Sequence, residues 1–363
     1  MKYLRLKDAC EILVSLRVPV TASNREKGKY PYYGANGIQD YISDYIFDDE
    51  LVLLAEDGGN FGSKEKPIAY RVSGKCWVNN HAHVLKPKQG LDVDYLCYSL
   101  MFYKVDGMVN GATRQKLTQT AMKEMKIPMR NMGKQLQIVD ELNRTVNVKE
   151  HRKQQLKLLD ELVKARFVEL FGDCNNLISM EDVCSIITDG THQPPKFQES
   201  GIPFILVSNL SNNTITYNTE KYISEETYSA LYKRTPIEIG DLLLSTVGSY
   251  GHPAVVTEDT RFLFQRHIAY LKPKREIVNS FYLHSALLAP DGQRQIEEKI
   301  KGIAQKTLNL SEIRKIMIPV PEIEEQNQFS DFVRAIDKSK VAIQKSLDET
   351  QILFDSLMQK YFG

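Results

Sequence analysis

The side chains in this sequence that could do chemistry lie in four pairs of polar segments, with one member of each pair in each half of the chain. These segments are rich in amide, imidazole, hydroxyl and basic groups. In the major groove of DNA, Arg or Lys makes paired hydrogen bonds to guanine, and Asn or Gln makes them to adenine. The segments therefore indicate recognition of a polar ligand, with a nucleic acid as the leading candidate.

The candidate contact residues follow the four segments of each half in order. In the first half they are Tyr32, Tyr33, Asn36, Asn60, Asn80, His81, Thr113, Arg114, Gln115 and Lys116. In the second half they are Thr191, His192, Gln193, Lys196, Ser249, Tyr250, Arg266, His267, Gln305 and Lys306. The last pair, residues 113–116 and 305–307, follows a glycine and precedes a short predicted helix, an arrangement suited to phosphate or base contact. The alternative is that these segments are simple turns, and that the two histidines are structural residues at strand starts.

Catalytic motifs are missing from the sequence. An adenine methyltransferase needs an Asn/Asp-Pro-Pro-Tyr/Phe tetrapeptide, and residues 193–196 (QPPK) lack the aromatic residue. No phosphate loop of the Gly-x-x-x-x-Gly-Lys-Ser/Thr type is present, nor is a convincing acid-acid-Lys nuclease set. Cys76, His81 and His83 could form part of a metal site, but no fourth ligand has suitable spacing. The sequence therefore predicts a protein with no catalytic centre and no metal.

Composition places the chain among globular proteins. Of its 363 residues, 42% are hydrophobic and 26% are charged, and this length favours two domains. The longest aliphatic runs, such as residues 51–55, fall far short of the ~20 residues that span a bilayer. The N-terminus lacks the apolar core of a signal peptide, and the five cysteines are scattered without a Cys-x-x-Cys pair. We expect a cytoplasmic protein.

Charge gives a weaker indication. The formal net charge is +1, with 27 Lys+Arg against 22 Asp+Glu in residues 1–175 and 20 against 24 in the remainder. A protein that bound DNA alone would usually be more basic, because phosphate neutralisation supplies most non-specific affinity. If the chain binds DNA, we expect partner proteins to share that binding.

The chain contains an internal duplication. Residues 111–172 align without a gap to residues 302–363 at a constant offset of 191, with 12 identities in 62 positions. Outside this block, residues 85–88 and 271–274 share the sequence Leu-Lys-Pro-Lys, and His81 falls opposite His267. Landmarks that recur in the same order indicate two copies of one structural unit.

Each copy begins with a segment of mixed α/β character, residues 1–130 and 174–321. Short β-branched or aromatic runs bounded by Gly, Asn, Asp and Pro predict strands. The predicted strands are residues 68–72, 82–85, 204–207, 254–257 and 268–271. A helix is predicted after each Lys-Pro-Lys turn, near 93–103 and 280–289.

Each copy ends in a long helical segment, residues 131–173 and 322–363, with the helices at about 134–170 and 324–361. The second helix follows a heptad with columns through Phe329 and Val333, and the 191-residue offset transfers these columns to the first helix as far as Arg166 and Leu170. The two helices would pack antiparallel, with the two globular segments at opposite ends. At 1.5 Å per residue, ~37 residues extend about 55 Å, or roughly 16 base-pair steps of 3.4 Å.

A lysine interrupts each heptad seam, at Lys149 and at Lys340. A charged residue in a seam either specifies register or marks a contact for another group. Alternatively, the register drifts there and the lysine extends outward to solvent.

Together these features resemble the specificity subunits of type I restriction-modification systems, over essentially the whole chain. The motifs are residues 30–37 (YPYYGANG), 189–195 (DGTHQPP), 201–205 (GIPFI), 240–245 (GDLLLS) and 318–326 (IPVPEIEEQ). The first half departs from the family pattern before its long helix, with Met129-Arg130 in place of Val320-Pro321.

The resemblance implies two target-recognition domains, each binding one part of a split DNA sequence, and paired helices that set the unread gap between them. It also implies two modification subunits that use S-adenosylmethionine to methylate adenine, and two restriction subunits that use ATP and Mg²⁺. Those cofactors would belong to the partner subunits. Three other interpretations remain open: the specificity part of a fused or split type II enzyme, a coiled-coil scaffold that binds protein alone, and a nuclease with an unfamiliar metal site.

Overall fold

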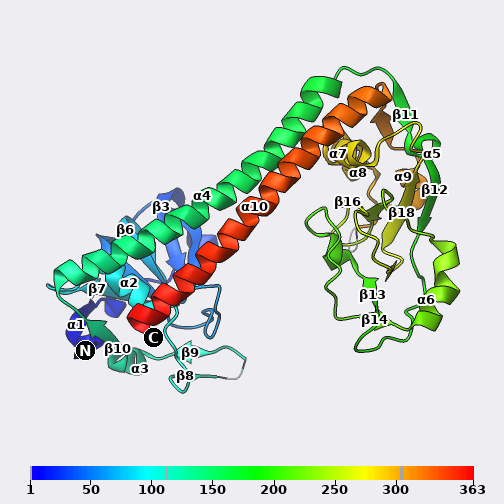
Figure 1. Cartoon of the computed structure of the whole chain (residues 1–363). Coiled ribbons are helices and arrows are strands. Elements are labelled where there is room, and N and C mark those ends of the chain that lie inside the picture. The colour runs from blue at the N-terminus through cyan, green and yellow to red at the C-terminus, as the bar shows by residue number, and fades with distance from the viewer. Residues whose placement is uncertain (1, 112, 303–305) are drawn as a thin grey trace. The chain divides into compact units, whose positions relative to one another are not determined.

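The computed structural model describes residues 2–111, 113–302 and 306–363. The chain divides into two compact units, residues 1–152 with 346–363, and residues 153–345. Each unit contains a globular head and one end of each of two long helices (Figure 1). We call residues 2–130 the first head and residues 174–321 the second head.

The first head is built on a six-stranded sheet with strand order β2-β7-β5-β6-β3-β4. Its neighbours pair antiparallel except for β3 and β6, which pair in parallel. The strands are β2 (Cys10–Ile12), β3 (Lys27–Gly34), β4 (Gly37–Ile42), β5 (Phe47–Ala55), β6 (Ala69–Val78) and β7 (Ala82–Pro87). Residues 51–55 of β5 are fully buried, which explains the continuous apolar run in the sequence.

The second head repeats four strands of that sheet in the same order, β12-β18-β15-β16, and adds a separate sheet, β14-β13-β17. The first four are β12 (Cys184–Asp189), β15 (Leu242–Ser245), β16 (Pro253–Val255) and β18 (Ile268–Pro273). The added three are β13 (Ile202–Ile205), β14 (Tyr222–Ile223) and β17 (Leu263–Phe264). The duplication predicted from the sequence is therefore also present in the sheet topology.

Short elements link each sheet to the long helices. In the first unit they are β1 (Lys2–Arg5), α1 (Leu6–Ala9), α2 (Val93–Met101), β8 (Val109–Asn110), β9 (Lys116–Leu117), α3 (Gln119–Glu124) and β10 (Lys126–Met129). In the second they are β11 (Leu177–Ser179), α5 (Met180–Val183), α6 (Glu225–Leu231), α7 (Ser280–Leu288), α8 (Pro290–Lys299), α9 (Leu310–Ile313) and β19 (Met317–Pro319). Four short 3-10 turns complete the described elements: Val14–Leu16, Ala22–Asn24, Val207–Leu210 and Tyr232–Arg234.

All five strands predicted from the sequence overlap observed strands. The prediction for residues 204–207 was shifted, because β13 already ends at Ile205 and a 3-10 turn starts at Val207. The helices predicted near 93 and 280 begin there as α2 and α7, where the side chains of Asp92 and Asn279 cap their first turns.

The long helices are α4 (Met132–Phe171) and α10 (Ile323–Phe362), one to two residues longer at each end than predicted. Within each unit their ends lie side by side (Figure 1). The start of α4 lies beside the end of α10 in the first unit, and the reverse holds in the second, so the pairing is antiparallel. No helix of the described residues is long and apolar enough to cross a membrane.

The heptad seam predicted on α10 is confirmed, since every position in both columns is buried or half-buried. On α4 the prediction fails at its last two positions. Arg166 and Leu170 are exposed, whereas Phe167 and Phe171 are 4% exposed. Beyond Val163 the seam advances by four residues at each step, which brings both phenylalanine rings against Phe329 of α10 at centroid distances of 5.5 Å.

The two seam lysines each contact the opposite helix. Lys149 donates to Oε1 of Gln351, and Nζ of Lys340 lies 2.5 Å from Oδ1 of Asp160. The residues of the two contacts are related by the same offset of 191. The same polar contact between α4 and α10 is therefore made twice, once in each unit. Both lysines are half-buried. The lysines therefore contribute to the register of the pair, which favours the first of the two interpretations of these residues.

A buried glutamine joins each long helix to its head. In the second unit, Gln326 accepts a hydrogen bond from the backbone N–H of Asn279 at 2.9 Å. Its Nε2 donates to the carbonyls of Ile277 and Pro321 at 3.1 and 2.9 Å. In the first unit Gln135 makes the equivalent three bonds, to Asp92, Gly90 and Arg130. Neither glutamine has exposed surface. Water therefore cannot reach the side-chain amide, and its hydrogen bonds are made to the protein backbone.

We predict that Gln326→Ala lowers the unfolding free energy of the second unit by about 2–4 kcal/mol, because three buried backbone groups lose their partner. Chemical denaturation followed by circular dichroism measures this change. The matched control is Gln328→Ala, on the exposed face of the same helix, for which a change within about 0.5 kcal/mol is expected. Equal losses in the two variants would contradict the role of the buried amide.

Candidate nucleic-acid interface

In each head, backbone hydrogen bonds bring three of the four predicted polar segments together. In the first head the N–H of Glu56 donates to the carbonyl of His81 at 2.9 Å, and the N–H of Gly58 donates to that of Gln115 at 3.2 Å. In the second head Thr246 donates to His267 at 2.9 Å and Gly248 to Lys306 at 3.3 Å. These bonds form one backbone frame that occurs in both heads.

The fourth segment joins the same frame by a different contact in each head. In the first, Nδ2 of Asn36 donates to the carbonyl of Gly58 at 3.0 Å. In the second, the N–H of Thr191 donates to Phe264 at 2.9 Å, and the N–H of Arg266 donates to Thr191 at 3.1 Å. All four predicted segments therefore converge in each head.

Glycine is required at the turn of the frame. Gly58 and Gly248 have φ angles of +61° and +75°, in the left-handed region that other residues rarely adopt. Each glycine follows a buried strand, β5 or β15, and turns the chain. The N–H of the glycine can then donate to a carbonyl shortly before Leu117 or Leu308. The predicted polar side chains lie on the loops around these turns.

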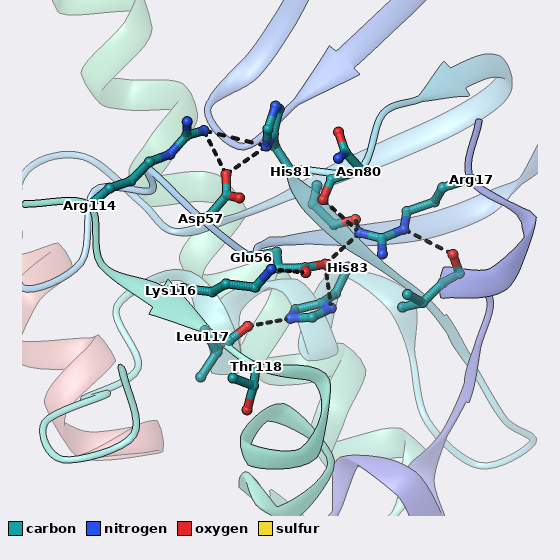
Figure 2. Close-up of polar contacts among 12 residues, drawn as sticks. Arg17, Glu56, Asp57, Asn80, His81, His83, Arg114, Lys116, Leu117 and Thr118 are labelled. Atoms are coloured by element: carbon teal, nitrogen blue, oxygen red, sulfur yellow. Dashed lines mark hydrogen bonds and ion pairs between the residues drawn. The ribbon is translucent and has the colours of Figure 1, made fainter. Parts of the chain in front are cut away.

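Two adjacent carboxylates organise the polar side chains of the first head (Figure 2). Glu56 lies 2.6 Å from Nη1 of Arg17 and 3.1 Å from Nζ of Lys116. Asp57 lies 2.6 Å from Nδ1 of His81 and 2.7 Å from Nη2 of Arg114, all through Oδ1. The Glu56 side chain is 11% exposed, so its cluster forms the buried base beneath the more exposed Asp57 cluster.

The protonation states follow from this burial. Burial by itself raises the pKa of Glu56, but Arg17, the protonated form of His83 and Lys116 together outweigh it and hold the pKa below its ordinary value. Burial lowers the pKa of His83, whose Nε2 lies 2.8 Å from the carbonyl of Leu117. His83 is therefore neutral near pH 7, with Nε2 donating to Leu117. Its Nδ1, 3.4 Å from Glu56, has no hydrogen-bond partner among the described residues.

The second head places an aspartate between a histidine and an arginine at a different point of the fold. Asp189, at the end of β12, lies 2.8 Å from Nε2 of His192 through Oδ2 and 2.8 Å from Nη2 of Arg234 through Oδ1. A groove of about 760 Å³ runs beside this cluster, lined by residues 190–196 and by residues of α6 and the turn that follows it. On a neighbouring loop, the pKa of His267 is lowered, mainly by burial and to a lesser extent by the positive charge of Arg266.

Most of the predicted contact residues lie at the surface. Exposed side chains are those of Asn36, Asn80, Thr113, Arg114, Gln115, Lys116, His192, Gln193, Lys196, Ser249, Arg266 and Lys306. Half-buried ones are those of Tyr33, Asn60, His81, Thr191, Tyr250 and His267. Gln305 lies outside the described residues. Whether any of them touches a nucleic acid stays a prediction.

The prediction for Tyr32 is wrong, because its side chain is 1% exposed and lies in the core. Its hydroxyl accepts from the N–H of Val20 and donates to the carbonyl of the same residue, and Arg25 covers its ring at 4.1 Å. Side chains alternate between the two faces of a strand. The neighbouring Tyr33 is half-buried on the opposite face.

Sequence reasoning missed several members of these clusters. Arg17 lies in an irregular segment without a detected repeat counterpart, and nothing in its sequence context marks it. Arg234 ends a 3-10 turn and was equally unmarked. Glu56 carried one usable signal, since an acidic residue directly after a buried strand needs a partner. Among the described residues, no group of three or more His, Cys, Asp or Glu side chains could hold a metal ion.

We predict that the unfolding free energy of the first unit falls as the pH is lowered below about 6.5, the ordinary pKa of histidine. The folded pKa of His83 is depressed, so between that value and 6.5 the unfolded chain binds a proton that the folded chain does not. His83→Gln, which retains a donor toward Leu117, should flatten this dependence. Chemical denaturation between about pH 7.5 and 5.5 measures it. The control is His151→Gln, an exposed position on α4 of the same unit, and an unchanged slope in His83→Gln would refute the assignment.

Known proteins share both the sequence pattern and the fold. The family model described as type I restriction modification DNA specificity domain matches residues 1–158 and again 176–351. A Haemophilus influenzae protein that carries the name of a type I restriction enzyme specificity subunit is 24% identical over 98% of this chain and 92% of its own. The MjaVIII specificity subunit of Methanocaldococcus jannaschii is 20% identical over 92% of this chain and 85% of its own.

Among solved structures, the type I restriction-modification S subunit from M. genitalium matches with a TM-score of 0.59 and 14% identity. That match covers all of this chain and 96% of the other, and at this identity it supports the fold alone. The fold predicted from the sequence, two similar α/β heads joined by two long antiparallel helices, is confirmed. Because the family model covers nearly the whole chain in two copies, the chain belongs to the type I restriction-modification DNA specificity family.

Proposed function

We propose that each head of this chain binds one part of a split DNA sequence and that the chain has no catalytic centre of its own. The observation that carries this proposal is the backbone frame that occurs in both heads and presents polar loops in each. Its side chains are of the types that hydrogen-bond base edges. Loops held on a rigid scaffold are the usual location of binding residues.

The distribution of charge supports a shared grip on DNA. The loops of the two heads carry exposed cations, among them Arg114, Lys116, Lys196 and Arg266, while the whole chain has a net charge of +1. Phosphate contacts supply most of the non-specific affinity of a DNA-binding protein. In this proposal the chain therefore supplies base contacts, and its partners supply much of the phosphate contact.

The partners we propose are two modification subunits and, in a restricting system, two restriction subunits. S-adenosylmethionine would bind the modification subunits, and ATP with Mg²⁺ would bind the restriction subunits. We propose that the partners dock on the long helices, which carry exposed aliphatic side chains. These include Leu136, Val148, Leu158 and Leu162 on α4, and Val341, Ile352 and Leu353 on α10.

Single-molecule methylome sequencing of a strain that expresses the chain with its modification subunit tests the proposal. We expect methyladenine at a split motif, and its loss when the chain is deleted. Replacing residues 176–300 with those of another specificity subunit should change one half of the motif and leave the other intact, because these residues hold three of the four polar segments of the second head.

The control is the same strain with an inactive modification subunit, which should show no methylation at the motif. Methylation that persists without the chain would count against DNA recognition by these heads. A replacement that changes both halves of the motif would contradict the assignment of one half to each head.

A further inference from the structure

Each head holds an arginine and a histidine on one half-buried aspartate. In the first head, Oδ1 of Asp57 lies 2.7 Å from Nη2 of Arg114 and 2.6 Å from Nδ1 of His81 (Figure 2). The Asp57 side chain is 18% exposed, whereas that of Arg114 is 59% exposed. The anchor is thus largely out of solvent while the group it holds remains accessible.

The second head has the same combination of groups at a site that the repeat does not predict. Asp189 is 19% exposed and holds Arg234, which is 53% exposed, together with His192. At the position of Asp57 the second head has Val247, next to Thr246 of the shared backbone frame. An inherited copy therefore does not explain the second cluster, and the two heads form similar clusters from unrelated residues.

Stability of the fold does not account for these clusters. Ion pairs that involve an exposed arginine contribute little to folding, because water screens them and ordering the side chains costs entropy. The contact instead restricts the long arginine side chain. In the first head this restriction is reinforced by Gly58, where a β-carbon would lie 3.2 Å from Nε of Arg114. The loop therefore leaves room for the guanidinium to lie close against its backbone.

A guanidinium held in this way suits one nucleic-acid group in particular. The contacts of Arg114 with Asp57 and His81 involve Nη2, and neither Nε nor Nη1 takes part in them. Arg234 likewise contacts Asp189 through Nη2. The aspartate accepts one N–H of Nη2, and the other N–H of Nη2 together with Nη1 or Nε forms a pair that matches the O6 and N7 acceptors of guanine in the major groove. Holding the side chain in place before binding reduces the entropy lost when the base is bound.

We propose that Arg114 and Arg234 each bind a guanine, one in each half of the target, and that Asp57 and Asp189 are the positioning residues that orient them. This inference rests on the proposed function, since it assumes that the heads bind DNA, and it specifies the base. It predicts a guanine in each half-site whose recognition depends on one arginine and one aspartate.

The test uses the complete complex in cells, with methylome sequencing of single variants of the chain. Arg114→Ala should relax the motif at one G·C pair of one half-site by roughly 10- to 100-fold in discrimination. Asp57→Asn should relax the same pair by a smaller factor, because the arginine remains but the oxygen that holds it is no longer charged. Arg234→Ala and Asp189→Asn should do the same in the other half-site.

The matched control is Asp49→Asn, which breaks an ion pair with Lys86 at 2.6 Å on the sheet of the first head. It should leave the motif unchanged. If Arg114→Ala does not accumulate as folded protein, Arg114→Lys replaces it, because lysine keeps the charge but lacks the fork. That variant should relax the same base pair.

Three results would overturn the inference. A wild-type motif in which at least one half-site lacks a guanine would contradict the inference directly. So would arginine variants that weaken methylation evenly at an unchanged motif, since that is the behaviour of a phosphate contact. In both cases the wild-type motif still depends on the chain, so the proposed function stands. Wild-type methylation that is independent of the chain would instead refute the proposed function, and the inference with it.

Discussion

The arrangement of this protein depends on one buried amide that occurs twice. Gln135 and Gln326 each lie at the start of a long helix and bind the backbone around the N-terminus of the short helix α2 or α7. A fully buried amide is tolerated when its donors and acceptor are satisfied, and then it permits one arrangement of the surrounding backbone. The direction in which each long helix leaves its head is fixed at this point, and a tyrosine of the short helix adds a bond nearby, Tyr95 to Pro128 and Tyr282 to Pro319.

The backbone frame that occurs in both heads connects this fixed region to the polar loops. The backbone of β5 or β15 continues into a glycine turn whose amide is bonded to the segment before Leu117 or Leu308, and that segment precedes α3 or α9. The polar loops of each head are therefore held by backbone hydrogen bonds to the residues directly after the central strand β5 or β15 and to the segment before α3 or α9. Groups that recognise a ligand by hydrogen bonds gain specificity when their positions are fixed in advance, and these loops are fixed by backbone contacts that tolerate changes of side chain.

Most of the architecture could be predicted from the sequence because the repeat and the heptads are properties of spacing. The predicted helices and strands all overlap observed ones, and the seam on α10 is confirmed. The prediction failed where spacing carries no information. Arg166 and Leu170 were placed in the seam because a heptad was extended through the aromatic end of α4, where Phe167 and Phe171 have the larger apolar surface to bury. Tyr32 was predicted from its loop and lies in the core. Arg17 and Arg234 could not be found, since their roles depend on contacts distant in sequence.

The two heads differ in side chains on a backbone that they share, and this difference has a physical consequence. Glu56, Asp57 and Lys116 of the first head correspond to Thr246, Val247 and Thr307 of the second. A buried carboxylate is stable when cations pair with it, so the first head contains Arg17 and Lys116 beside Glu56. The second head has a neutral threonine there and needs neither cation, and its aspartate is at the end of β12 instead. Two heads with identical loops would favour target halves of the same sequence. Because the charged groups occupy different positions in the two heads while the backbone frame is the same, the two halves of a bound target need not have the same sequence.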